Sequence, residues 1–146
     1  YQALAAKADI QTLRLEGVDG MLWCCLMGGA NDGGYLKPVI DNYGYPKLAF
    51  YTMRESFGSL WAASDCVDVL HNEKWKINPV VFGTQKNKLY SLTIKILDMQ
   101  NKEIKRHMFK MKRGNNGCIR LEEWTPDIQE EGYYELRYEL EETEAF

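Results

Sequence analysis

The chain has 146 residues, of which 45% are hydrophobic and 27% are charged. These values are typical of globular proteins and exclude wholesale disorder, and the length fits one ordinary domain or one small domain plus a piece of another. The net charge of −3 excludes a nucleic-acid binder that works mainly by neutralising phosphates.

The chain begins with the pattern of a helix followed by a buried strand. Residues 1–15 are rich in alanine and repeat apolar side chains at three- and four-residue spacing, which predicts a helix. Residues 20–27, GMLWCCLM, form an unbroken apolar run. A strand that is apolar on both faces belongs to a parallel sheet covered by helices. The expected inward face of the helix consists of Tyr1, Leu4, Ala5, Ala8, Thr12 and Leu15.

A loop, a turn and a second helix follow the apolar run. Residues 28–34, GGANDGG, have the composition of a loop, and residues 42–47 form a turn in which Pro46 suits the first helical position. A parallel strand needs parallel neighbours, and no second unit of this kind follows. We therefore expect residues 1–62 to be a piece of a larger α/β fold that could dimerise through its exposed surface. The expected apolar face of the second helix is Ala49, Phe50, Met53, Phe57, Leu60 and Trp61.

From residue 63 onward the apolar period changes to two, which is typical of half-buried strands. The alternation slips near Met108, which indicates a β-bulge, and the acidic residues 139–144 are expected to fray. Short strands separated by turns predict an immunoglobulin-like antiparallel sandwich over residues 63–146. The expected strands are 66–71, 78–84, 90–96, 104–112, 117–121 and 134–140.

The order of these motifs resembles the end of the catalytic barrel in glycoside hydrolase family 2. The alanine-rich helix YQALAAKADIQTLR, a G-x-L-W strand, an Asn31-Asp32 loop and the segment DNYGYPKLAFYTMRESF carry the resemblance. The phrases NPVVFGT, LTIKILDMQNKEI and GYYELRYEL extend it over essentially the whole chain. The family includes β-galactosidases, β-mannosidases and β-glucuronidases. The resemblance implies a helix–strand–helix fragment of a (β/α)8 barrel over residues 1–62, followed by the sandwich.

The sequence departs from the family pattern in two ways. The family usually has a polar residue and Leu-Asn-Asp soon after the strand tryptophan, whereas here Cys24 to Gly29 precede Asn31-Asp32, so that alignment requires an insertion. The two catalytic glutamates of the family lie on earlier barrel strands. No catalytic residue can therefore be assigned in this chain, and we expect the chain alone to be inactive.

Two residues are candidates for contacting a substrate in the intact parent, Trp23 and Asp32. Retaining glycosidases need two carboxylates about 5 Å apart, and Asp32 and Asp41 are the only acids near the end of the apolar run. Either aspartate could contact a sugar hydroxyl or, as we favour, stabilise a turn through its own backbone. Trp23 could stack on a sugar ring or belong to the core, and the resemblance favours a substrate-lining position.

The other reactive side chains show no spacing that indicates a metal or cofactor site. Cys24, Cys25, Cys66 and Cys118 lack metal spacing, because adjacent residues of a strand point to opposite faces. Unpaired thiols favour a reducing compartment such as the cytoplasm. No apolar run approaches the ~20 residues of a membrane span, so no membrane partner is expected. His71 and His107 are interpreted as strand-face residues, and Trp61, Trp75 and Trp124 as packing residues rather than a sugar platform.

Three functional hypotheses follow from the sequence. The first is a non-catalytic carboxy-terminal region of a family 2 glycoside hydrolase, whose partners are the rest of the barrel and the carbohydrate substrate of the parent. The second is a free-standing carbohydrate-binding or protein-interaction sandwich. The third, a small independent enzyme, lacks a constellation of catalytic residues.

Overall fold

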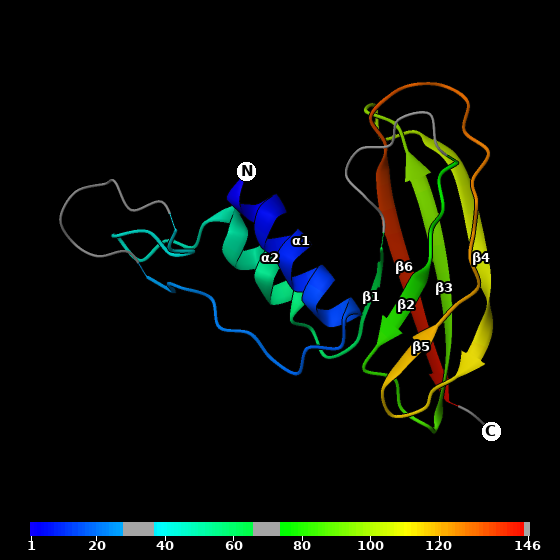
Figure 1. The fold of residues 1–146 in the computed structure, drawn as a ribbon, viewed down its shortest axis with the longest axis horizontal. Coiled ribbons are helices and arrows are strands. Elements are labelled where there is room, and N and C mark those ends of the chain that lie inside the picture. Colours follow the sequence, from blue (N-terminus) through cyan, green and yellow to red (C-terminus); the bar gives the residue numbers. More distant parts are fainter. Residues whose placement is uncertain (28–36, 66–73, 145–146) are drawn as a thin grey trace. The chain divides into compact units, whose positions relative to one another are not determined.

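The computed structural model describes residues 1–27, 37–65 and 74–144, which form the two helices and six strands drawn in Figure 1. The chain divides into two compact units, Tyr1–Gly58 and Ser59–Phe146. The sequence placed the boundary at residue 62, inside what is the first strand of the second unit. The predicted strand at 66–71, the glycine-rich loop at 28–34 and the candidate Asp32 lie outside the described residues.

The first helix, α1, spans Gln2–Leu15 as predicted, but it buries a different face from the expected one. Its buried residues are Ala3, Ala6 and Ile10, whereas Leu4 is 70% exposed. Small alanine side chains let a neighbouring helix approach closely, and this stripe faces the second helix. The helix is therefore apolar on two sides, and only one side is covered within the unit.

The second helix, α2, spans Leu48–Ser56 and is shorter than predicted. Lys47 is its N-cap, so Pro46 lies just before the helix, and the helix ends five residues before Trp61. The guanidinium of Arg14 at the end of α1 donates to the carbonyl oxygens of Ser56, at 2.5 Å, and Gly58, at 3.0 Å. Those carbonyls lie at the helix end and lack intrahelical partners. One side chain therefore terminates α2 and ties it to α1.

The predicted buried strand at residues 20–27 is wrong. The segment is extended, Leu22 is fully exposed, and its pairing is an isolated parallel bridge between Met27 and Ile40. The backbone N–H groups of Val39 and Ile40 donate to the carbonyls of Cys25 and Leu26, at 3.3 and 2.9 Å. A parallel strand needs a ladder of neighbours to satisfy its backbone. Within the described residues that ladder is reduced to this one bridge, so a barrel fragment is not confirmed.

The second unit is a mainly antiparallel β-sandwich, as predicted. One sheet has the order β1-β2-β5 and the other the order β4-β3-β6, and every pairing is antiparallel. Buried side chains from both sheets, among them Val81, Ile94 and Phe109, form a single core cluster. The strands are β1 Trp61–Ser64, β2 Pro79–Phe82, β3 Lys88–Leu97, β4 Glu103–Arg113, β5 Cys118–Arg120 and β6 Glu135–Glu144.

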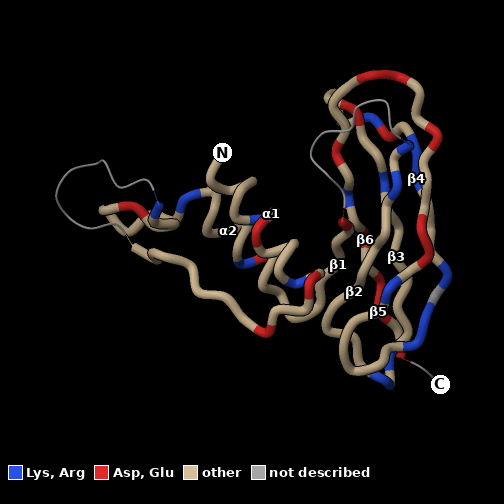
Figure 2. The backbone as a smooth tube through the Cα atoms, in the orientation of Figure 1, with Lys and Arg blue, Asp and Glu red and all other residues tan. Residues whose placement is uncertain are grey.

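Two details of the second sheet refine the expectations from sequence. Tyr90 pairs with Lys112 and Leu92 with Phe109, so β4 carries the expected bulge slightly beyond Met108. The acidic tail does not fray, because β6 pairs with β3 out to Glu144. Cross-strand ion pairs hold it there, with Lys88 contacting Glu142 and Glu144 and Lys95 contacting Glu139. Basic and acidic positions are accordingly interspersed over the strands in Figure 2.

A close backbone contact fixes the turn after β2. Gly83 has a φ of 74°, and a Cβ atom there would lie 1.7 Å from the carbonyl oxygen of Ser59. The left-handed conformation and the lack of space both require glycine. This contact joins the start of the unit to the end of β2.

Candidate functional site

The first unit contains an open, mainly apolar pocket of ≈ 540 Å³. Its walls come from the start of α1 and from the extended segment that replaces the predicted strand. The Gln2 side chain amide fixes the far wall, because it donates to the carbonyl oxygens of Lys37 and Pro38. The lining residues are Tyr1, Gln2, Ala5, Leu22, Trp23, Cys24 and Lys37.

Trp23, the sequence candidate for a substrate contact, is half-buried and lines this pocket. Its ring packs against the small core of the unit, which includes Ala6, Ile10 and Met53. The indole Nε1 is buried and has no hydrogen-bond partner within the part of the chain that the structure describes. Buried donors in folded proteins are nearly always paired. The side chain thus combines an aromatic face on the pocket with a buried donor that no described residue satisfies.

The two candidate aspartates are not brought together as a catalytic pair. Asp32 lies outside the described residues. Asp41 holds its own turn: its Oδ1 accepts hydrogen bonds from the backbone N–H groups of Tyr43, at 2.9 Å, and Tyr45, at 2.8 Å. The turn interpretation of Asp41 is therefore confirmed, since one oxygen of its carboxylate accepts from two backbone N–H groups of the turn.

The cysteine pair was misjudged from the sequence. The expectation that Cys24 and Cys25 point to opposite faces of a strand is wrong, because no strand forms and the two Sγ atoms lie 2.9 Å apart. The hydrogen bond between the thiols, followed by the charge on Cys25, raises the pKa of Cys24, while the nearby Lys37 ammonium opposes the shift. The two adjacent cysteines were the available signal in the sequence. To predict their contact from that signal, one would need to know that residues 20–27 do not form a strand.

The aromatic residues of the sandwich serve packing. Trp61 stacks on Phe82 with ring centroids 5.8 Å apart, and Trp124 stacks on His107 at 5.3 Å. Trp75 is tilted against Tyr134 at 6.2 Å. Trp75 and Trp124 are both partly buried against the sandwich core, which confirms that they are packing residues. His71 lies outside the described residues.

Across residues 1–27, 37–65 and 74–144, no cluster of three or more His, Cys, Asp and Glu residues could hold a metal ion. In the same ranges no helix has the length and apolar character to span a membrane. The pocket has a mainly apolar wall that includes Trp23, together with one lysine, Lys37, and one thiol, that of Cys24. Such a site can orient a ligand but has no acid and base pair.

Comparisons with known proteins leave the family of the chain undetermined. No family model matches the sequence, and no curated protein matches it. A solved structure of β-D-mannosidase from Dictyoglomus thermophilum is similar in fold, with a TM-score of 0.45 and 15% identity. The match covers 75% of this chain and 14% of the mannosidase chain. This chain therefore spans a small part of the length of that protein.

Proposed function

We propose that this chain is a non-catalytic carboxy-terminal region of a family 2 glycoside hydrolase. It would supply the last helix–strand–helix of the (β/α)8 barrel and an immunoglobulin-like sandwich. Support comes from the motif order of the sequence, and from the chain path of the sandwich. The chain changes sheet between β2 and β3, between β4 and β5 and between β5 and β6, which is a connection pattern of immunoglobulin-like domains.

The observation that carries the proposal is the exposed apolar surface of the first unit. Its exposed large side chains come from α1, from the extended segment, from the turn and from α2. A helix that is apolar on more than one side suits a position with neighbours on each side, and large apolar side chains left exposed on several elements suit an interaction surface. The rest of a barrel would supply those neighbours. The side chains are Tyr1, Leu4, Leu22, Leu26, Met27, Tyr43, Tyr45, Leu48 and Tyr51.

The role of the chain in the parent follows from what it lacks. The retaining mechanism uses one carboxyl group as acid and base and another as nucleophile, and both would come from earlier barrel strands. This chain would close the barrel and present Trp23 to the carbohydrate, with Asp32 as a further polar contact. The place of Trp23 in the lining of the pocket supports this role, because an aromatic side chain combines an apolar face with a polar group.

A free-standing carbohydrate-binding sandwich is the second candidate. Such a module needs aromatic rings exposed on one surface to stack on sugars. Trp61, Trp75 and Trp124 instead pack on other aromatic rings of the sandwich. Their packing favours the structural role over the binding module.

The decisive experiment reads the gene upstream of Tyr1 and assays two proteins. We expect the full reading frame to encode a barrel with two strand-end glutamates, and its product to hydrolyse an aryl β-mannoside, β-galactoside or β-glucuronide with retention. The present chain should release no chromophore from any of the three, because it has neither acid nor nucleophile. A reading frame that starts near Tyr1, or turnover by this chain that is lost on changing Asp41→Asn, would contradict the proposal.

A further inference from the structure

The adjacent cysteines of the extended segment form a close sulfur pair. The Sγ atoms of Cys24 and Cys25 lie 2.9 Å apart, which is hydrogen-bond contact between the two thiols. In a regular strand the two side chains would point to opposite faces. Here the absence of strand geometry brings both sulfurs to the same side of the backbone. A small movement separates this contact from a covalent bond, whose S–S length is about 2.05 Å.

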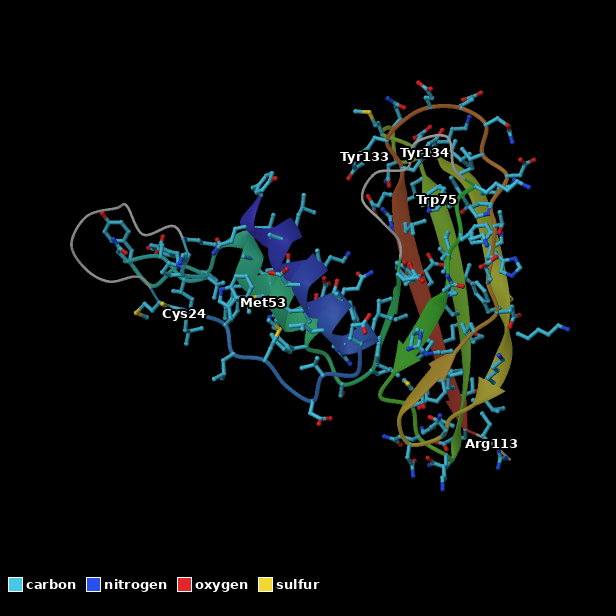
Figure 3. All side chains as sticks on the ribbon, viewed as in Figure 1. Cys24, Met53, Trp75, Arg113, Tyr133 and Tyr134 are labelled. Carbon is cyan, nitrogen blue, oxygen red and sulfur yellow. The ribbon has the colours of Figure 1, made fainter. Side chains whose placement is uncertain are left out.

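The sulfur pair is open to small reagents. Cys24 is exposed and lines the pocket, whereas Cys25 is half-buried behind it. The Lys37 side chain lines the same pocket, and its charge opposes in part the rise in the pKa of Cys24 that the neighbouring Cys25 causes. Figure 3 shows Cys24 with its sulfur on the outside of the first unit. A reagent can therefore reach one sulfur from solvent, and the second sulfur stands next to it.

We propose that Cys24 and Cys25 are a vicinal dithiol that low-molecular-weight disulfides, such as oxidised glutathione, convert to an intramolecular disulfide. The Cys24 thiolate attacks one glutathione sulfur, breaks the glutathione S–S bond and releases the first glutathione. Cys25 then attacks Cys24 Sγ, forms the protein S–S bond and expels the second glutathione. Two protein thiols are oxidised, one disulfide is reduced, and both thiol protons end on the two released glutathiones.

The second step is favoured by proximity. The attacking sulfur of Cys25 is held in contact with Cys24, so the reaction is intramolecular and needs no encounter. Cys118 is exposed on β5 in the other unit and has no sulfur partner among the described residues, so it should stop at a mixed disulfide. Closure of the pair would convert the one thiol that lines the pocket, Cys24, into part of an apolar disulfide. This inference holds independently of the proposed glycosidase origin.

The test is peptide mapping of the unmodified chain after exposure to oxidised glutathione. The tryptic peptide from Leu15 to Lys47 contains Cys24 and Cys25 and no other cysteine. We expect this peptide to lose two hydrogen atoms, to carry no glutathione, and to regain them with dithiothreitol. The peptide that contains Cys118 should carry one glutathione in the same digest, which shows that the reagent was active.

Two single variants serve as matched controls. In Cys25→Ser the reaction should stop with one glutathione on Cys24, because the attacking sulfur is absent, and Cys24→Ser should leave Cys25 slower to react. The proposal is overturned if the unmodified peptide retains glutathione beside a free thiol, stays fully reduced while Cys118 is modified, or is cross-linked to another cysteine. Because mapping reads a covalent mass, it does not depend on any enzymatic activity.

Discussion

The thiol of Cys24 is held in its protonated form by its neighbour, and this has a measurable effect on its reactivity. Because the hydrogen bond between the two thiols is the main cause of the raised pKa, Cys25→Ala should lower the pKa of Cys24 toward its usual value. A larger thiolate fraction near pH 8 should then speed alkylation of Cys24 several-fold. The rate can be followed with iodoacetamide on the tryptic peptide. An unchanged rate would mean that the thiols do not interact in solution.

Trp23 allows a second test at the level of single residues, made in the intact parent. Trp23→Ala should lower kcat/KM while the melting temperature changes little, whereas truncating a fully buried core tryptophan would cost about 3–5 kcal/mol of stability. Trp23→Phe is the matched control, since it keeps a smaller aromatic face and removes the indole N–H. A hydrogen bond from Nε1 to the sugar would make the Phe variant defective as well.

The opposite result would place Trp23 in the core. Its signature is a large loss of stability in Trp23→Ala with unchanged kinetics in the enzyme that remains folded. The isolated chain should bind mono- and disaccharides negligibly in either case, because one aromatic face without converging polar groups is a small part of a binding site. Isothermal titration calorimetry with mannose and a mannose disaccharide checks this.

The sequence predicted the role of a single residue correctly where that role depends on neighbours in the chain. Asp41 was expected to stabilise a turn, and an aspartate in a segment with Gly44 and Pro46 does so through bonds to nearby backbone groups. The pairing of Cys24 with Cys25 was missed because the inference depended on an assumed strand. Trp23 was expected either at a substrate face or in the core, and it lines the pocket while it packs against the core of the first unit.

Among the elements of the sandwich, the turn at Gly83 offers the sharpest test. Gly83→Ala would place a methyl group against the Ser59 carbonyl and force a non-glycine residue into positive φ, which together should cost roughly 3 kcal/mol or more. Gly117→Ala is the control in the same unit, since its nearest contact would be an ordinary 3.6 Å. Urea unfolding of both variants gives the comparison. Equal stabilities would show that the turn relaxes freely.

Sequence patterns identified the elements that pack on a core formed by the described residues themselves. β3 and β6 alternate apolar and polar residues and pack one face on a core, so period two is sufficient to find them. β1 was missed because its sequence, WAAS, continues the apolar pattern of the preceding helix. The inward face of α1 was misassigned because both of its sides are apolar, and the smaller side chains pack closer.

At the scale of the whole molecule, the two units should differ in stability. The sandwich buries large side chains such as Leu92, Ile94 and Phe109, whereas the buried residues of the first unit are mostly small. Hydrogen exchange should therefore be slow for the amides of residues 92–96 and fast for residues 21–27. The sandwich expressed alone, as residues 59–146, should melt at the same temperature as the sandwich does in the full chain. Slower exchange in residues 21–27 would instead identify the first unit as an autonomous core.

The reach of Arg14 has a consequence for chain entropy. Its guanidinium contacts carbonyls 42 and 44 residues further along the chain, so the two helices close a long loop for a small area of contact. Loop-closure entropy grows only as the logarithm of length, about 0.6 kcal/mol for each doubling. Lengthening the connection would thus weaken the helix pair little, whereas Arg14→Ala would remove the clasp at its far end. Contacts made to the helix pair by other parts of a protein would therefore offset the loop-closure entropy more effectively than a shorter connection between the two helices would.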